Sequence, residues 1–280
     1  MRGDRARQTA AQRALRQQFT GVADARGYVA APADNLLDGV SLAQFEEDLR
    51  SGDGSELDGK FCAVHSSSAL AVNTFAWFKT VDRLPLLALC GIKGANTLSF
   101  ERRFPIFRGG RAPNLDVWIE TDTVDLAIES KLTEYLVPKR PAFSPAYDRL
   151  APPGLAEPCW WQVYEQAKTA APGYLDIAQL VKHYFGLRKH QQTTGQTKPI
   201  LFLYLHWEPL NAQIIPACQQ HIQELTHLST AVQESSITFR TMTYSQLWSS
   251  WSRISELAQH AENLKNRYEV VYDETGISFT

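Results

Sequence analysis

Two carboxylates and one ammonium stand in this sequence in an order that suits phosphodiester hydrolysis. Asp116 follows the segment Pro113-Asn114-Leu115, and the triplet Glu129-Ser130-Lys131 comes at the end of the next apolar segment. Carboxylate oxygens suit hard cations, and Mg²⁺ is commonly held by one or two carboxylates together with substrate phosphate and water. These residue types therefore indicate metal-dependent cleavage of a phosphate ester.

The spacing of these residues fits two neighbouring strands. Side chains alternate between faces along a strand, so Glu129 and Lys131 lie on the same face and the lysine sits beside its acid. The same alternation predicts Asp116 on the face opposite to that of its apolar neighbours, Leu115, Val117 and Ile119.

A hairpin turn between the two strands sets their register. With the turn centred on Asp122 and Thr123, Asp116 falls directly opposite Glu129 on one face of the hairpin. The same register places Glu120 against Asp125, a like-charge pair that we expect at the solvent end. The two candidate carboxylates are therefore predicted to meet across the hairpin.

Each of the three residues has a role in the expected chemistry. Asp116 and Glu129 are the candidate ligands of Mg²⁺, with Mn²⁺ as a possible substitute. A divalent ion polarises a phosphoryl oxygen and lowers the pKa of a bound water. Lys131 could orient that water or stabilise charge developing on phosphorus, and it offsets repulsion between the two acids when metal is absent.

The same residues resemble the PD-(D/E)XK nuclease superfamily, whose fold is restriction-endonuclease-like. Pro113 to Asp116 match the "PD" element, with the proline three residues before the acid, and Glu129-Ser130-Lys131 matches "(D/E)XK". A further likeness, to poorly characterised bacterial proteins of this type, lies in His65-Ser66-Ser67-Ser68-Ala69-Leu70 and Asn73-Thr74-Phe75. The resemblance implies a Mg²⁺-dependent nuclease and an α/β core of the order αβββαβ.

Hydrophobic periodicity predicts the elements of that core in the implied order. Residues 69–79 and 176–190 have helical spacing, the first after a serine-rich start that could cap a helix. Residues 98–106 alternate as a strand, and residues 199–205 form an apolar run typical of a buried strand. We therefore expect a mixed central sheet flanked by helices.

Further elements are expected on both sides of this core. The arginine-rich residues 1–27 form either a frayed basic arm or a surface helix. Residues 160–169, 217–233 and 244–267 are predicted to be helical, and residues 237–243 and 268–272 are predicted to be strands. The proline-rich residues 138–158 are expected to form a loop that borders the site.

Other polar residues are secondary candidates. Glu101 could add a third carboxylate to the metal site, or it could pair with a neighbouring arginine. Gln179 begins a segment similar to the glutamine-to-tyrosine helix motif of some superfamily branches, although Tyr184 comes one residue late. Gln162 and Gln166 share a helix face and could serve in its place, or they are ordinary surface residues.

The charge balance bears on a nucleic-acid partner. The net charge of −2 argues against indiscriminate adhesion to DNA, so a local basic patch would have to bind the backbone. Arginines cluster shortly before the first acid and either form that patch or lie on an ordinary solvated face: Arg102, Arg103, Arg108 and Arg111.

Composition fits one enzyme-sized domain. The chain has 280 residues, of which 44% are hydrophobic and 21% charged, so we expect a nuclease domain over residues 61–280 after a basic extension of residues 1–60. No apolar stretch reaches the roughly 20 residues that cross a bilayer, which favours a cytoplasmic protein. The cysteines, without a CxxC pair, suggest neither zinc nor disulfides: Cys62, Cys90, Cys159 and Cys218.

Three functions remain open at this point. The first is a Mg²⁺-dependent nuclease with DNA as its expected substrate and a homodimer as a possible assembly. The second is a catalytically inactive nucleic-acid-binding or assembly protein on the same fold. The third is an enzyme that acts on small phosphate esters.

Overall fold

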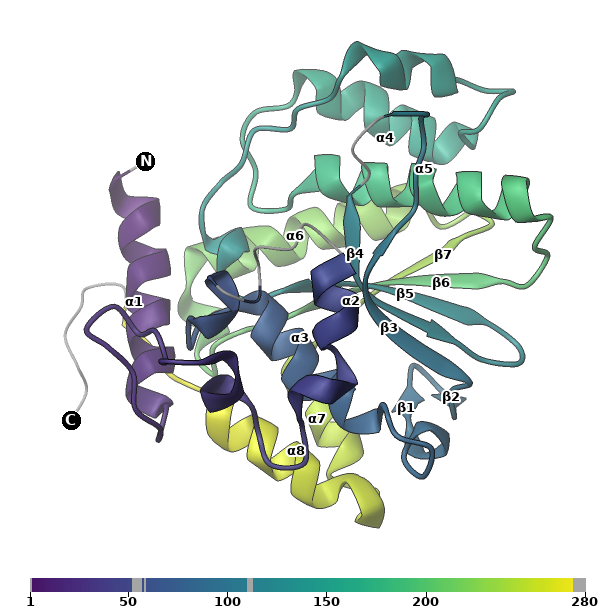
Figure 1. The fold of residues 1–280 in the computed structure, drawn as a ribbon. Coiled ribbons are helices and arrows are strands. Elements are labelled where there is room, and N and C mark those ends of the chain that lie inside the picture. The colour runs from purple at the N-terminus through teal and green to yellow at the C-terminus, as the bar shows by residue number, and fades with distance from the viewer. Residues whose placement is uncertain (1, 52–56, 58, 110–112, 274–280) are drawn as a thin grey trace.

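A mixed five-stranded sheet forms the centre of the molecule (Figure 1). The computed structural model describes residues 2–51, 57, 59–109 and 113–273. The first three strands of the sheet are antiparallel neighbours and the last three are parallel. In spatial order the strands are β3 (Thr97–Arg103), β4 (Asn114–Glu120), β5 (Asp125–Lys131), β6 (Ile200–His206) and β7 (Thr238–Thr243).

Helices cover both faces of the sheet. One core cluster joins Val117, Ile128 and Leu203 of the sheet to α1 (Arg2–Gln18), α3 (Ser67–Phe75), α7 (Tyr244–Trp251) and α8 (Ser255–Tyr268), and α2 (Glu46–Ser51) lies on the same side. The other cluster joins Trp118 and Phe202 to α4 (Pro158–Thr169), α5 (Ile177–Thr194) and α6 (Pro216–Ala231). The predicted α/β architecture with a mixed sheet and flanking helices is therefore confirmed.

The elements expected for the core occur in the expected order, α3, β3, β4, β5, α5 and β6, with α4 before α5. A small separate hairpin of β1 (Ala88–Leu89) and β2 (Ile92–Lys93) precedes β3. The serine-rich start does cap α3, because the Ser66 hydroxyl accepts a hydrogen bond from the Ala69 N–H at 3.2 Å. The helix ends at Phe75, earlier than predicted, and continues as a 3₁₀ turn over Ala76–Phe78.

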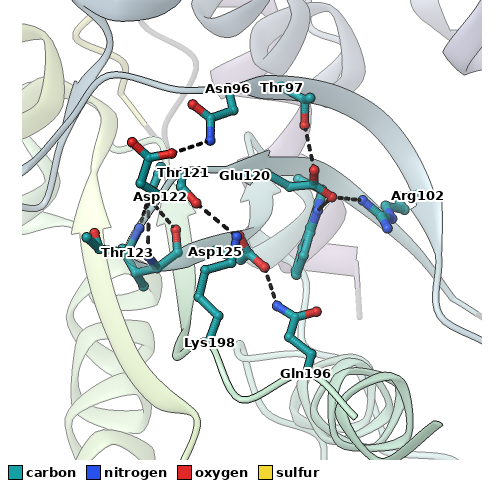
Figure 2. Close-up of polar contacts among 12 residues, drawn as sticks. Asn96, Thr97, Arg102, Glu120, Thr121, Asp122, Thr123, Asp125, Gln196 and Lys198 are labelled. Carbon is teal, nitrogen blue, oxygen red and sulfur yellow. Dashed lines mark hydrogen bonds and ion pairs between the residues drawn. The ribbon is translucent and has the colours of Figure 1, made fainter. Parts of the chain in front are cut away.

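The predicted hairpin register is confirmed. Val117 pairs with Ile128, and Glu120 pairs with Asp125, as a turn over residues 121–124 requires. The paired acids at the turn do not face each other uncompensated. Each has its own cation, because Arg102 lies 2.8 Å from Glu120 and Lys198 lies 2.6 Å from Asp125 (Figure 2).

Two C-terminal predictions need correction. Residues 244–267 form two helices, α7 and α8, separated by a turn over residues 252–254. Residues 269–272 form no strand. This segment is instead held to the loop after β6 by hydrogen bonds from Leu210 N to Val270 O at 2.8 Å and from Asn211 Nδ2 to Tyr272 O at 2.8 Å. Tyr272 N also donates to Asn211 Oδ1 at 3.4 Å.

The N-terminal segment packs onto the core as a helix. Ala11, Ala14 and Leu15 of α1 are buried in the same cluster as Val117 and Ile128. Of the two forms considered for residues 1–27, the structure therefore contains a surface helix with one buried face. Among the described residues, no helix is long and apolar enough to span a membrane.

Candidate active site

The strands β4 and β5 separate where the two candidate carboxylates lie. Their ladder extends from the turn to the pair Val117–Ile128, and Asp116 and Glu129 are the next residues along. Beyond that pair, a side chain of β4 bonds to the backbone of β5, because Asp116 Oδ2 accepts a hydrogen bond from the Ser130 N–H at 2.6 Å. Asp116 is thus held directly against the Glu129-Ser130-Lys131 segment.

Glu129 is fully buried, and a side-chain nitrogen lies close to each of its oxygens. Lys131 Nζ forms an ion pair with Oε1, and His183 Nε2 of α5 lies 2.8 Å from Oε2. Burial by itself would raise the pKa of Glu129, but Lys131 and His183 outweigh it and lower this pKa to about 2. Glu129 is therefore an anion at neutral pH.

Asp116 responds in the opposite direction. Burial and the negative charge of Glu129 raise its pKa well above the ordinary value, and Glu101 adds to the rise, while Lys131 and the Ser130 N–H oppose it. Burial lowers the pKa of Lys131, but Glu129 and Asp116 raise it more, so the lysine is held as a cation. The group accordingly combines one firm anion, one firm cation and one carboxyl that tends to keep its proton.

Glu101 lies next to Asp116 in the neighbouring strand. The β3–β4 ladder pairs Phe100 with Val117 and Arg102 with Leu115, so position 101 is level with Asp116. Glu101 has a left-handed backbone with φ of 52°, which a non-glycine residue rarely adopts. An acid held in this conformation beside two other acids is consistent with a functional constraint.

Level with the left-handed Glu101 of β3, the alternation of side chains along β4 is broken. This break corrects one prediction. Val117 and Ile119 belong to the core cluster on the α3 face, whereas Leu115 packs in the cluster on the α5 face. Leu115, Val117 and Ile119 therefore do not share one face, because the strand changes facing at Asp116. Strict alternation holds only on the turn side of this residue.

A cavity of about 120 Å³ adjoins Lys131 on the α5 side of the sheet. Gln179 lines it, so the structure brings this predicted residue to the lysine. Gln179 and His183 stand four residues apart on α5, a spacing that puts both on one helix face. The remaining lining residues are Glu134, Tyr135, Val137, Lys139, Tyr174, Asp176 and Tyr204.

His183 is the residue that the sequence analysis did not select. The sequence holds a signal for it, because a histidine one turn after Gln179 falls where the similar helix motif has its tyrosine. What the sequence does not contain is the docking of α5 that brings His183 to Glu129.

The other candidates lie outside this group. The Arg102 guanidinium is bound to Glu120, and its carbon lies 4.9 Å from the centre of the Trp118 ring, at the turn end of β4 (Figure 2). Arg103 donates to Asn114 Oδ1 at 3.0 Å. Arg108 is exposed, and Arg111 lies outside the described residues. Gln162 and Gln166 are exposed on α4, and Gln166 borders a different hollow, near α6.

The side chains of this group suit a hard cation that takes only one or two of its ligands from the protein. Within the described ranges, no group of three or more His, Cys, Asp or Glu side chains is arranged to hold a metal, and none of the four cysteines forms a disulfide. Zinc usually takes three or four such ligands, whereas Mg²⁺ is held by one or two carboxylates. Asp116 and Glu129, whose like charges repel each other, fit the pattern of a Mg²⁺ site.

One family model matches most of the chain. The family model described as "restriction endonuclease associating with ARP" matches residues 5–269. The chain belongs to this family. The match includes most of α1, the whole sheet and α8, so the family extends over the site and the helices around it. Neither the curated proteins nor the solved structures gave a match. The description of the restriction endonuclease associating with ARP family suggests a nuclease-like role.

Proposed function

We propose that this protein is a metal-dependent nuclease of the PD-(D/E)XK type that hydrolyses the phosphodiester bonds of DNA. The observation that carries the proposal is the convergence of Asp116, Glu129 and Lys131 where β4 and β5 separate. The order of elements around these residues supports the restriction-endonuclease-like assignment, because α3 precedes strands β3, β4 and β5 and α5 follows them.

The proposed roles follow from the state of each group. Asp116 and Glu129 would hold Mg²⁺ or Mn²⁺, which when bound would supply a polarised phosphoryl oxygen and an acidified water. Lys131 is a firm cation, so it serves to stabilise developing negative charge rather than to accept a proton. His183 keeps Glu129 oriented, and Gln179 borders the space beside the lysine.

The raised pKa of Asp116 supports the cation site. Two acids that repel each other in the absence of metal are stabilised when a divalent cation replaces the proton that one of them holds. Glu101, level with Asp116, would add further negative potential at the same place.

Cleavage assays on polymeric nucleic acids test the proposal. Purified protein should cleave plasmid or linear DNA with Mg²⁺ or Mn²⁺ and not with EDTA, and a parallel assay on RNA defines the substrate class. Lys131→Ala should lower the rate by about a hundredfold or more, because a positioned charge is lost from the transition state. Retention of the fold is checked by circular dichroism. Full activity of Lys131→Ala would contradict the assignment.

One observation favours the alternative of an inactive nucleic-acid-binding or assembly protein. Lys131 forms an ion pair with one oxygen of Glu129 and His183 lies 2.8 Å from the other, so the acid also has a purely structural use. Isothermal titration separates the two functions. A nuclease should bind Mg²⁺ or Mn²⁺ with loss of the signal in Asp116→Asn, whereas the absence of binding at millimolar metal favours the inactive protein.

A further inference from the structure

The first helix carries more arginines than acids. α1 (Arg2–Gln18) has five arginines and one acid, Asp4. Pairs of opposite charge one turn apart commonly stabilise surface helices, but Arg5, Arg13 and Arg16 have no Asp or Glu three or four residues away in this helix. Arg5 and Arg7 also stand near the N-terminus of α1, where the helix dipole disfavours cations. The stability of the helix does not explain this composition.

Specific contacts fix α1 beside the candidate active site. Gln8 Nε2 donates to the Thr133 carbonyl at 3.3 Å, and Gln12 Nε2 lies 3.5 Å from the Thr133 hydroxyl. Thr133 follows Lys131 by two residues. Arg7 Nη1 donates at 3.1 Å to the hydroxyl of Tyr174, which lines the cavity beside Lys131. The helix is thus anchored to the segment that leaves the site.

The anchored helix turns its other arginines to solvent. Ala11, Ala14 and Leu15 are buried, whereas Arg5, Arg13 and Arg16 are exposed. By the period of an α-helix these three arginines fall within one side of α1, opposite the buried residues. In the part of the chain that the structure describes, none of them pairs with a carboxylate, and Arg16 donates only to the neutral carbonyl of Ala25, at 2.6 Å.

We propose that this arginine face, defined as Arg5, Arg13 and Arg16, binds the phosphate backbone of the nucleic acid that enters the site. The proposal rests on the proposed function and adds to it the surface that holds the substrate. It also resolves the charge problem, because a chain with net charge −2 binds a polyanion only through a local basic surface. The proposed binding surface therefore lies on α1. The arginines that precede Asp116 do not form it, and Arg102 among them is bound to Glu120.

Salt-dependent binding tests the proposal. The probe is a fluorescein-labelled DNA duplex in EDTA, with the dissociation constant measured by anisotropy over a series of salt concentrations. The triple variant Arg5→Gln, Arg13→Gln and Arg16→Gln should bind at least about tenfold more weakly. The magnitude of the slope of log affinity against log salt should fall by about 2.7, because each of the three lost phosphate contacts removes about 0.9 from it.

A charge-matched control separates the face from net charge. It carries Lys93→Gln, Arg149→Gln and Arg253→Gln, three exposed positions in β2, in the 3₁₀ helix Pro145–Leu150 and in the turn after α7. This control should bind nearly as well as the wild type. Equal losses in both triple variants, an unchanged triple variant of α1, or a wild type that does not bind DNA would each overturn the proposal.

The two proposals fail separately. If the wild type binds DNA through α1 but does not cleave it with Mg²⁺ or Mn²⁺, the arginine face stands and the nuclease assignment falls. If the wild type cleaves DNA and the α1 variant binds and cleaves equally well, the reverse holds. Vesicles containing phosphatidylserine form the last arm. Retention of the wild type on them, lost in the α1 variant while DNA binding is unchanged, would assign the face to anionic lipid and overturn the proposal.

Discussion

At the residue scale, His183 determines how Glu129 is held. Its Nε2 lies 2.8 Å from a fully buried carboxylate oxygen, and replacement by alanine would leave that oxygen with no partner from α5. We expect His183→Ala to lower the free energy of unfolding by about 1–3 kcal/mol, the usual cost of a buried polar group without a partner. Urea denaturation measures this loss.

A matched variant separates positioning from simple packing. His183→Gln keeps an N–H donor at the end of the side chain. Its DNA cleavage rate should therefore be higher than that of His183→Ala. If His183→Ala and His183→Gln cleave DNA equally well, His183 has no positioning role.

Residue-scale prediction from sequence succeeded where chemistry is local and failed where it depends on docking. The neighbourhood of Glu129 and Lys131 follows from alternation along a strand, and the ion pair between them is present. The contact of His183 with Glu129 depends on how α5 packs over β5, which no local pattern contains. Likewise, nothing in the residue type of Glu101 signals its left-handed φ of 52°.

At the scale of the elements, α5 approaches the end of β3 closely enough to require a glycine. A Cβ built on Gly186 would lie 2.8 Å from the Phe104 carbonyl oxygen and 2.9 Å from its Cβ. Gly186→Ala should therefore destabilise the fold by about 1–3 kcal/mol, as overpacked sites do, even though alanine gains about 1 kcal/mol of helix propensity.

Chemical denaturation checks this prediction against an exposed position in the same helix. Gln192 is exposed on α5, and Gln192→Ala should change the free energy of unfolding by less than about 0.5 kcal/mol. A Gly186→Ala protein as stable as the wild type would show that α5 can move away from Phe104 without cost. Cleavage measured on the same variant reports whether that movement displaces His183 and Gln179.

The elements themselves were largely predictable, for identifiable reasons. The register of β4 with β5 follows from a polar turn between two apolar segments, and the apolar run of β6 marks a strand buried on both faces. Residues 268–272 were mistaken for a strand because Tyr268, Val270 and Tyr272 are buried with strand-like alternation. Their burial comes instead from packing of the chain end against the core, and their backbone bonds go to a loop.

At the scale of the whole molecule, the docking of α1 joins a segment predicted as a separate extension to the core that carries the site. Phe45 and Leu15 share a core cluster with strands β4 and β5, so the free energy of that cluster depends on residues from both sides of position 60. The division into residues 1–60 and 61–280 remains a prediction, as do the cytoplasmic location and the homodimer.

The opposed pKa shifts of the two acids make global stability depend on pH and on metal together. An acid with a raised pKa in the folded state binds its proton more tightly there, so Asp116 costs stability as pH rises above its ordinary value of 3.8. Glu129, with a pKa lowered to about 2, instead contributes stability above its ordinary value of 4.5, which is lost as pH falls towards 2.

A divalent cation should remove the cost that ionised Asp116 imposes. Metal competes with the proton on Asp116, so stabilisation by Mg²⁺ should grow as the pH rises above the ordinary Asp pKa of 3.8. It should reach about 2.7 kcal/mol when the metal is a hundredfold above its dissociation constant. Thermal melts with and without Mg²⁺ measure it. Asp116→Asn mimics the protonated acid. Without metal it should melt at a higher temperature than the wild type, and Mg²⁺ should not raise its melting temperature. The control Asp122→Asn, at the turn of the same hairpin, should keep the full Mg²⁺ response. A Mg²⁺ response of Asp116→Asn as large as that of the wild type would place the cation elsewhere on the molecule.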